Sequence, residues 1–286
     1  MTNPTVLRRY VALELRRLRE AAGLSMDEVG KELGRSGSTV RHLETQRSLP
    51  GRLEVERLLQ LFGVSERTEG FLNLVNAARR GKDWWADFPG VPERMDLLLG
   101  MEAAVVDIRG YDVMLVPGLF QTPTYAKEVF RAGESNLAHE ELQSRIDLRM
   151  QRQDILTRRP DPPAVWWVLD ESVLTRRASD PMVLPEQLNH LVRLGDLPNV
   201  HIQILPSDAV GIHAGMDGSF RIFTFGSEMV NDPGVVYTES RVSGNYHEKP
   251  ADIQRYHETW LQVQVHALNP EESRAMLVRR VEEITT

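Results

Sequence analysis

A single glycine separates two short helical segments near the amino-terminal end, and this pattern restricts the fold more than any other in the chain. Ser25 and Glu28 form the S-x-x-E pattern of a capping box, which begins a helix that Gly34 ends. A second helix is expected to begin at Ser36 and to run to about Thr45. The two helices are therefore joined by a tight turn.

Three further helices are expected around this pair. Apolar residues recur at helical spacing from Leu7 to Ala22, which predicts a helix over residues 5–22. After the turn SLPG, residues 53–62 are predicted to form a fourth helix and residues 65–80 a fifth. A compact set of five helices with a tight turn between the second and third has the layout of a helix-turn-helix, whose second helix lies in the major groove of DNA.

The helix that follows Gly34 has the properties of a DNA-reading element. Val40 and Leu43 are its only large apolar residues, and they fix it to the domain. Five small or polar residues are left for base edges: Gly37, Ser38, Thr39, Arg41 and His42. The N–H groups of its first turn also suit a phosphate. Taken singly, each feature has an alternative, because a Gly- and Ser-rich start often belongs to a loop and an arginine or histidine often belongs to a solvated face.

The charge of the chain is divided unevenly. Residues 1–82 contain 15 Lys and Arg against 10 Asp and Glu, whereas the remaining residues contain 19 against 31. A basic first part attached to an acidic body favours a polyanion as the partner of the first part, and local fluctuation is the alternative.

Composition excludes several classes of protein. The chain has no cysteine, which excludes disulfides, cysteine zinc sites and thiol catalysis. No apolar run approaches the length of a transmembrane helix, and the charged amino-terminal sequence differs from a signal peptide. These features predict a cytoplasmic protein without a membrane partner.

The length of 286 residues predicts two domains, with boundaries at 1–82 and 83–286. After Gly81, β-branched and aromatic runs alternate with helical segments. The expected strands are 111–117, 164–172, 199–206, 219–225 and 234–240, and the expected helices are 124–132, 138–157, 183–195, 250–268 and 270–283. The predicted fold is multidomain, with an all-α domain followed by an α+β domain around one sheet.

Residues 7–64 resemble the XRE-type helix-turn-helix domain, the lambda-repressor-like fold of phage repressors and Cro. The stretch LRRLREAAGLSMDEVGKELGRSGSTVRHLETQRSLP runs in step with that family without a gap. The resemblance implies that Gly37, Ser38, Thr39 and His42 face bases and that Arg41 and Thr45 lie nearer the DNA backbone. Ser36 and Arg47 complete the candidate DNA-binding set.

The same resemblance implies an ion pair and the loss of one DNA contact. Arg19 and Glu44 align with a buried Arg–Glu pair that ties the first helix to the third. Where the family commonly has a glutamine that touches a phosphate, this chain has Met26, so that contact is expected to be missing.

Residues 84–283 resemble the second domain of a group of actinobacterial, antitoxin-like XRE regulators, the WhiJ-like proteins. Five phrases carry the resemblance in order: VPGLFQTPTYAKEVF, RMQRQDIL, VLDESVLTRR, VHIQILP and VVYTES. The resemblance implies a transcriptional regulator, a repressor in our interpretation, whose second domain responds to a small partner protein encoded nearby. A regulator whose second domain binds a metabolite is the alternative.

The sequence contains no H-E-x-x-H, P-loop or dinucleotide-binding glycine motif. GRSGS nearly matches the G-x-S-x-G elbow but lacks its last glycine, and it stands between two helices. His201 and His213 flank an expected strand, and Asp170, Glu171 and Glu239 lie at strand ends, where acids can act as a pair. Strand-end carboxylates more often cap the next helix. We therefore expect no enzymatic activity, no cofactor and no metal.

The sequence does not decide the roles of two further segments, one basic and one apolar. Arg145, Arg149 and Arg152 form one stripe of a helix, which could meet an acidic partner or pair with acids of its own domain. PGLFQTPTYA suits a ligand pocket, a protein contact or simple packing.

A homodimer is expected, since one helix-turn-helix contacts only a few base pairs. The surface proposed to hold two copies together consists of Phe71, Leu74, Val75, Trp84 and Trp85. The alternative is that these residues seal the junction with the second domain.

Overall fold

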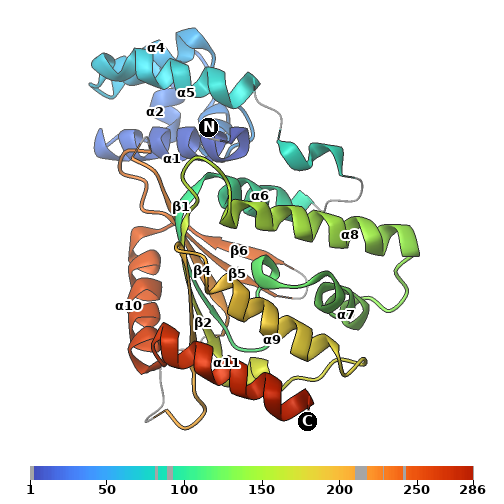
Figure 1. Ribbon diagram of the computed structural model, residues 1–286. Helices are drawn as coiled ribbons and strands as arrows, with labels where there is room; N and C mark the ends of the chain where they lie inside the picture. Colours follow the sequence, from blue (N-terminus) through green and yellow to red (C-terminus); the bar gives the residue numbers. More distant parts are fainter. Residues whose placement is uncertain are drawn as a thin grey trace. The chain divides into compact units, whose positions relative to one another are not determined.

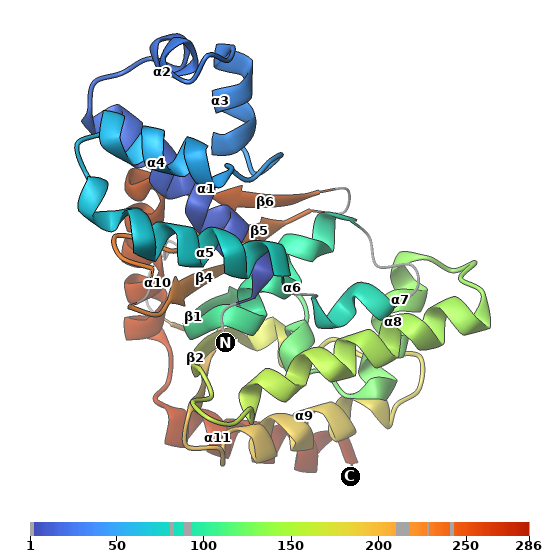
Figure 2. The same cartoon turned by 90° about the horizontal axis from the view of Figure 1, so that it is seen from above.

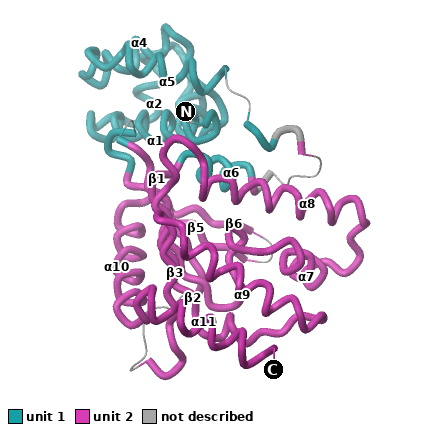
Figure 3. The backbone as a smooth tube through the Cα atoms, viewed as in Figure 1, with its two compact units in different colours: residues 1–86, 96–104, 227–232 teal, residues 87–95, 105–226, 233–286 magenta. Residues whose placement is uncertain are grey.

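The protein is described by a computed structural model over residues 3–80, 83–88, 93–209, 218–227, 229–240 and 243–285. It divides into two compact units (Figure 3). The first unit contains residues 1–86, 96–104 and 227–232, and the second contains residues 87–95, 105–226 and 233–286. A helical domain is followed by a domain with a mixed sheet and helices, which confirms the expected fold class.

Five helices form the body of the first unit (Figures 1 and 2). They are α1 (Pro4–Ala21), α2 (Met26–Glu32), α3 (Gly37–Glu44), α4 (Arg52–Leu61) and α5 (Thr68–Arg80), with a 3₁₀ turn at Ser65–Arg67. Three of the connections turn at a glycine with positive φ, namely Gly23, Gly34 and Gly63. Only glycine adopts this conformation without strain, which explains why the helix ends were predictable.

One apolar cluster forms the core of these helices. Its members are Val11, Leu15, Leu18, Val29, Leu33, Val40, Leu43, Val55, Leu58, Leu59, Phe71 and Val75. Val40 and Leu43 are the two buried residues of α3, as the sequence predicts. Burying an aliphatic side chain of this size stabilises a fold by about 1.5–3 kcal/mol. These two residues therefore anchor α3 and leave the rest of its surface available.

An additional helix, α6 (Glu93–Ala104), was not predicted, and most of it belongs to the first unit. Trp85 donates its indole N–H to Asp96 at 3.1 Å and is 3% exposed. Phe71 and Val75 lie in the core cluster. Phe71 and Val75 pack in the unit's own core and Trp85 is buried, so the expectation that these three residues join two copies is wrong.

Residues 227–232 also belong to the first unit, although they lie between two strands of the sheet in the sequence. Arg9 on α1 forms a two-pronged ion pair with Asp232, with nitrogen–oxygen distances of 2.6 and 3.2 Å. Both side chains are almost completely shielded from solvent. The hydroxyl of Tyr10 donates to the carbonyl oxygen of Val230 at 3.1 Å. The first unit is thus assembled from distant parts of the chain.

The second unit is built on a six-stranded mixed sheet with the order β3-β2-β1-β4-β5-β6. Its strands are β1 (Val105–Asp112), β2 (Ala164–Asp170), β3 (Val200–Leu205), β4 (Phe220–Phe225), β5 (Val235–Glu239) and β6 (Gly244–His247). β1, β2 and β3 are parallel, whereas β4, β5 and β6 join by antiparallel pairing that starts at β1. The sheet is therefore parallel on the β2 side of β1 and antiparallel on the β4 side.

Helices cover both faces of the sheet (Figures 1 and 2). They are α7 (Pro123–Gly133), α8 (His139–Arg152), α9 (Val183–Leu194), α10 (Pro250–His266) and α11 (Pro270–Thr285). α10 packs on one face through Ile253, Trp260 and Val263. α7, α8 and α9 lie on the other face, and α11 lies along the β3 edge and against α9.

The first strand lies earlier in the sequence than expected. The sequence predicts a strand over 111–117, whereas β1 ends at Asp112 and the following Met114 is 52% exposed. The ring of Trp167 fills the space where a side chain on Gly110 would lie. Because β1 contains this glycine and several charged residues, its sequence does not read as a buried strand. β6 was also missed, since it is short and polar.

The arginine stripe of α8 pairs within its own unit. Arg145 contacts Glu134 at 3.0 Å and Glu141 at 2.7 Å. Arg149 donates to the side-chain oxygen of Gln121 at 2.6 Å, and Arg152 is buried. In the neighbouring PGLFQTPTYA stretch, the three apolar residues Leu119, Phe120 and Tyr125 are buried. The arginine stripe therefore makes its contacts within its own unit, and the apolar residues of PGLFQTPTYA pack inside it.

Candidate nucleic-acid interface

The backbones of α2 and α3 meet through glycines. A Cβ at Gly30 on α2 would lie 2.8 Å from the nitrogen of Gly37 and 2.8 Å from the carbonyl carbon of Ser36. Gly34 turns the chain between the helices with φ of 66°. In Figure 2, α2 is seen nearly end-on and α3 from the side, so the two helices cross steeply. A side chain at residue 30 would push α3 away, which makes this glycine part of the helix-turn-helix geometry.

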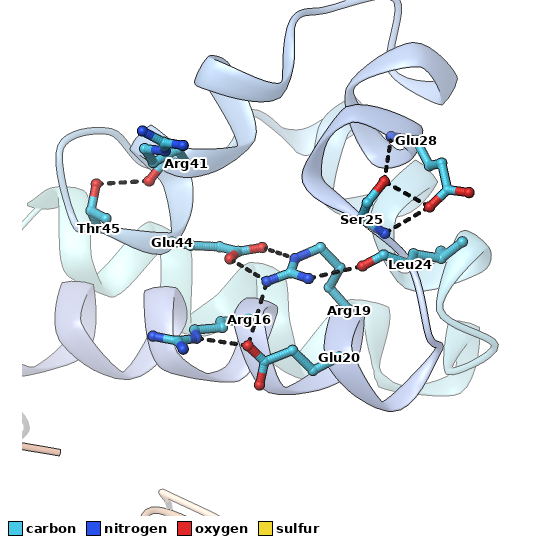
Figure 4. Close-up of polar contacts among 9 residues, drawn as sticks. All are labelled: Arg16, Arg19, Glu20, Leu24, Ser25, Glu28, Arg41, Glu44 and Thr45. Carbon is cyan, nitrogen blue, oxygen red and sulfur yellow. Dashed lines mark hydrogen bonds and ion pairs between the residues drawn. The ribbon is translucent and has the colours of Figure 1, made fainter. Parts of the chain in front are cut away.

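The start of α2 is closed by the expected capping box (Figure 4). The backbone N–H of Ser25 donates to the Glu28 carboxylate at 2.8 Å, and the N–H of Glu28 donates to the Ser25 hydroxyl at 3.2 Å. Hydrogen bonds from Ser25 lower the pKa of Glu28. The carboxylate therefore remains ionised and satisfies an N–H that the helix leaves open.

Arg19 and Glu44 form a buried ion pair between α1 and α3 (Figure 4). The Nε of Arg19 lies 2.6 Å from one Glu44 oxygen, and a second guanidinium nitrogen lies 2.9 Å from the other. A third nitrogen donates to the carbonyl oxygen of Leu24 at 2.8 Å. The side chains are 9% and 3% exposed, and the hydrogen bond with Glu44 raises the pKa of Arg19. The pair holds the carboxyl end of α3 against α1.

The face of α3 opposite its anchors is open to solvent. Its exposed members are Ser38, Arg41 and His42, with Ser36 before the helix and Thr45 and Arg47 after it. Gly37 and Thr39 are half-buried. All eight candidate DNA-binding residues therefore lie on one short stretch around α3. The sequence pattern does not single out Arg35 and Arg52, whose side chains are 61% and 79% exposed.

Ser36 occupies the N-cap position of α3 without capping a backbone N–H through its side chain. Its hydroxyl instead lies 2.7 Å from the hydroxyl of Ser38 and 3.3 Å from that of Thr39. The N–H of Thr39 donates to the Ser36 carbonyl oxygen at 3.0 Å. The first turn of α3 thus presents three hydroxyls, and at least one of its N–H groups is already used.

Thr45 and Gln46 end α3. The hydroxyl of Thr45 donates its only hydrogen to the carbonyl oxygen of Arg41 at 2.7 Å (Figure 4). Thr45 therefore does not donate to a phosphate while this bond is made. Gln46 has a positive φ of 64°, and the N–H of Arg47 returns to the carbonyl oxygen of His42 at 3.0 Å. This turn fixes the backbone of Arg47 directly after α3.

The residues considered for catalysis have other contacts. Asp170 accepts from the N–H of Ser172, which makes it the cap of a 3₁₀ turn, and Glu171 accepts from the N–H of Ser207. The ring of His201 lies 4.4 Å from that of Trp166. Glu239 ends β5 at an exposed position, and His213 lies outside the described residues. In the part of the chain that the structure describes, no three His, Cys, Asp or Glu residues are placed to hold a metal ion.

Sequence comparison assigns both parts of the chain. Residues 11–69 match a family described as a helix-turn-helix domain. Residues 95–279 match a family described as a domain of unknown function, DUF5753. No curated protein and no solved structure matches the chain. Among the described residues, no helix is long and apolar enough to cross a membrane.

The two matches agree with the two kinds of structure. The helix-turn-helix match covers α2 and α3 and supports an XRE-like, DNA-binding regulator rather than an enzyme. The second match covers the sheet and most of the helices around it. Because it spans well over half of the chain, the protein belongs to the DUF5753 family and carries a helix-turn-helix domain at its amino-terminal end.

Proposed function

We propose that the protein is a sequence-specific transcriptional regulator that places α3 in the major groove of double-stranded DNA. The supporting observation is the division of α3 between two faces. Val40, Leu43 and the Arg19–Glu44 pair fix one face, while the opposite face is exposed and polar. A helix that is held firmly and keeps polar residues free suits base reading.

The residues of α3 have distinct proposed roles. Ser38 and His42 read base edges, and Gly37 and Thr39 permit close approach of the helix start. Arg41 and Arg47 contact phosphates, which position the domain without reading sequence. Ser36 is one of three residues, with Ser38 and Thr39, whose hydroxyls lie close together at the start of α3. Thr45 stabilises the carboxyl end of α3 through its hydrogen bond to the Arg41 carbonyl oxygen, so its role in the site is structural.

The proposed assembly is a homodimer on a near-palindromic operator. Two copies would bind half-sites about 34–36 Å apart, one turn of the double helix, because a single α3 reads too few base pairs for genomic specificity. The first part of the chain is basic and therefore suits DNA, whereas the remainder is acidic and does not. Each copy is thus proposed to contact DNA through its first part alone.

The second unit is proposed to sense a signal. Its resemblance to WhiJ-like, antitoxin-like regulators supports a cytoplasmic repressor that responds to a small partner protein encoded nearby. The alternative is a metabolite-binding domain. A metabolite would raise the melting temperature by mass action at micromolar concentration, whereas a partner protein would co-purify with the chain.

Genome-wide mapping of bound DNA, followed by footprinting of the strongest site, tests the DNA-binding function. We expect protection of a near-palindrome by the wild-type protein. The matched control is Arg41→Glu combined with His42→Glu, because both positions are exposed and the change reverses or adds charge where DNA would lie. Footprints that are identical for the two proteins, or no footprint with the wild type, would contradict the proposal.

A further inference from the structure

Gly37, the first residue of α3, has its side-chain position filled by another residue. A Cβ built on Gly37 would overlap the Oδ1 atom of Asp27 and would lie 3.1 Å from its Cγ and 3.3 Å from its Cα. Asp27 belongs to the first turn of α2. The carboxylate of Asp27 therefore occupies the volume that a side chain at residue 37 would take.

This carboxylate is exposed, and its acceptor capacity is unused. No hydrogen bond or ion pair joins Asp27 to any residue within the described ranges. It lies in the first turn of α2 and beside the first residue of α3, where the positive ends of two helix dipoles favour a negative charge. Asp27 thus presents a carboxylate acceptor at the start of the proposed reading helix.

We propose that Asp27 acts as the side chain that Gly37 lacks, and that it reads a base carrying an amino group, cytosine in the first place. This inference rests on the proposed DNA-binding function. The amino groups of cytosine and adenine are the hydrogen-bond donors of the major groove, and acidic side chains accept from cytosine N4. The other polar atoms there, purine N7, guanine O6 and thymine O4, are acceptors that repel a carboxylate.

The same carboxylate excludes a second kind of contact. A helix N-terminus normally attracts phosphate through its open N–H groups and its dipole. With Asp27 beside Gly37, a phosphate at the start of α3 would face a negative charge. Asp27 therefore favours complexes in which a base amino group, rather than the DNA backbone, meets the start of α3, and it acts as a specificity-determining residue.

Selection of bound sequences from randomised DNA tests this role in the full-length protein. The variants are Asp27→Asn, which removes the charge, and Gly37→Ala, whose methyl group displaces the carboxylate without removing it. Glu66→Gln is the control, because Glu66 is an exposed acid in the 3₁₀ turn between α4 and α5. Melting temperatures identify any variant that fails to fold.

We expect the wild-type protein to prefer cytosine at one position of each half-site. Asp27→Asn and Gly37→Ala should both lose about tenfold in discrimination at that same position, whereas Glu66→Gln should match the wild type. Since Asp27→Asn preserves size, it decides the question even where Gly37→Ala does not fold.

Two results would overturn the inference while leaving the proposed function intact. The base preferences of Asp27→Asn could equal those of the wild type, or the variant could gain affinity equally on all sequences, which would reduce Asp27 to a phosphate-repelling charge. A wild-type protein without any sequence preference would instead overturn the proposed function, and the inference with it.

Discussion

Arg19 on α1 and Glu44 on α3 lie face to face, with two nitrogen–oxygen contacts of 2.6 and 2.9 Å. Both side chains are shielded from water. Breaking such a pair leaves one charge buried without its partner, which costs far more than the loss of an exposed ion pair. The orientation of α3 therefore depends on a contact that touches no DNA.

Replacing Glu44 with alanine is expected to unfold the first unit at a lower temperature. The cost should be about 3–5 kcal/mol, since Arg19 would keep its charge in a buried position. The control is Glu56→Ala, which removes an exposed partner of Arg52 and should cost at most about 0.5 kcal/mol. Thermal melting followed by circular dichroism measures both. A Glu44→Ala protein that melts like the wild type would show that the pair contributes little.

His42 and Arg41 should differ in how their loss affects DNA binding. His42→Ala is expected to weaken operator binding by about 1–3 kcal/mol and to leave binding to random DNA almost unchanged. Arg41→Ala should weaken both and reduce the slope of log affinity against log salt by about one unit. Titrations at several salt concentrations distinguish these effects. Equal losses for His42→Ala on both DNAs, or an unchanged slope for Arg41→Ala, would reassign the residue.

The stability of the second unit should fall as the pH rises through the range in which Asp112 titrates. Burial raises the pKa of Asp112 from 3.8 to about 6, and Trp167 donates its indole N–H to this carboxyl at 2.9 Å. The folded protein therefore keeps a proton that the unfolded chain releases. This contribution is complete below about pH 4 and is lost as the pH passes about 6.

Asp112→Asn tests this pH dependence, because the amide oxygen still accepts from Trp167 but does not ionise. Relative to the wild type, the variant should gain up to about 3 kcal/mol between pH 4 and pH 7.5. Melting temperatures across this range measure the difference. Parallel profiles for the two proteins would indicate that Asp112 titrates normally.

The assembly prediction concerns the full-length chain. Light scattering at micromolar concentration should give a dimer, and footprints should show two half-sites one helical turn apart. We expect the interface to lie outside residues 1–64. A monomer that protects a single half-site would contradict the dimer.

Local sequence signals predicted the parts of the first unit that depend on neighbouring residues. Gly23, Gly34 and Gly63 ended helices because their backbone conformation is one that glycine adopts without strain. Ser25 and Glu28 are three residues apart, so their capping box is visible in the sequence. The Arg19–Glu44 pair came from the family resemblance, since a separation of 25 residues carries no local signal.

The parts that sequence reasoning missed depend on contacts between distant segments. β1 was misplaced because Gly110 owes its buried position to Trp167, which belongs to another strand. Asp27 looked like an ordinary acidic residue of a first helical turn, and only the approach of α2 to α3 brings it to Gly37. The one sequence signal for this contact was Gly37 itself, a glycine at the first position of the helix proposed to read DNA. The Arg9–Asp232 pair spans 223 residues and had none.

The buried pair of Arg9 and Asp232 limits how such regulators can exchange their helix-turn-helix domains by recombination. A hybrid gene joined near residue 82 would carry Arg9 into its new host but would leave Asp232 and α6 behind. The transplanted helix would then contain a buried cation without its carboxylate, a defect of several kcal/mol. Recombination between related genes would succeed only where the recipient supplies an acid at the corresponding position. The helix-turn-helix domain and the sheet domain are therefore expected to be inherited together.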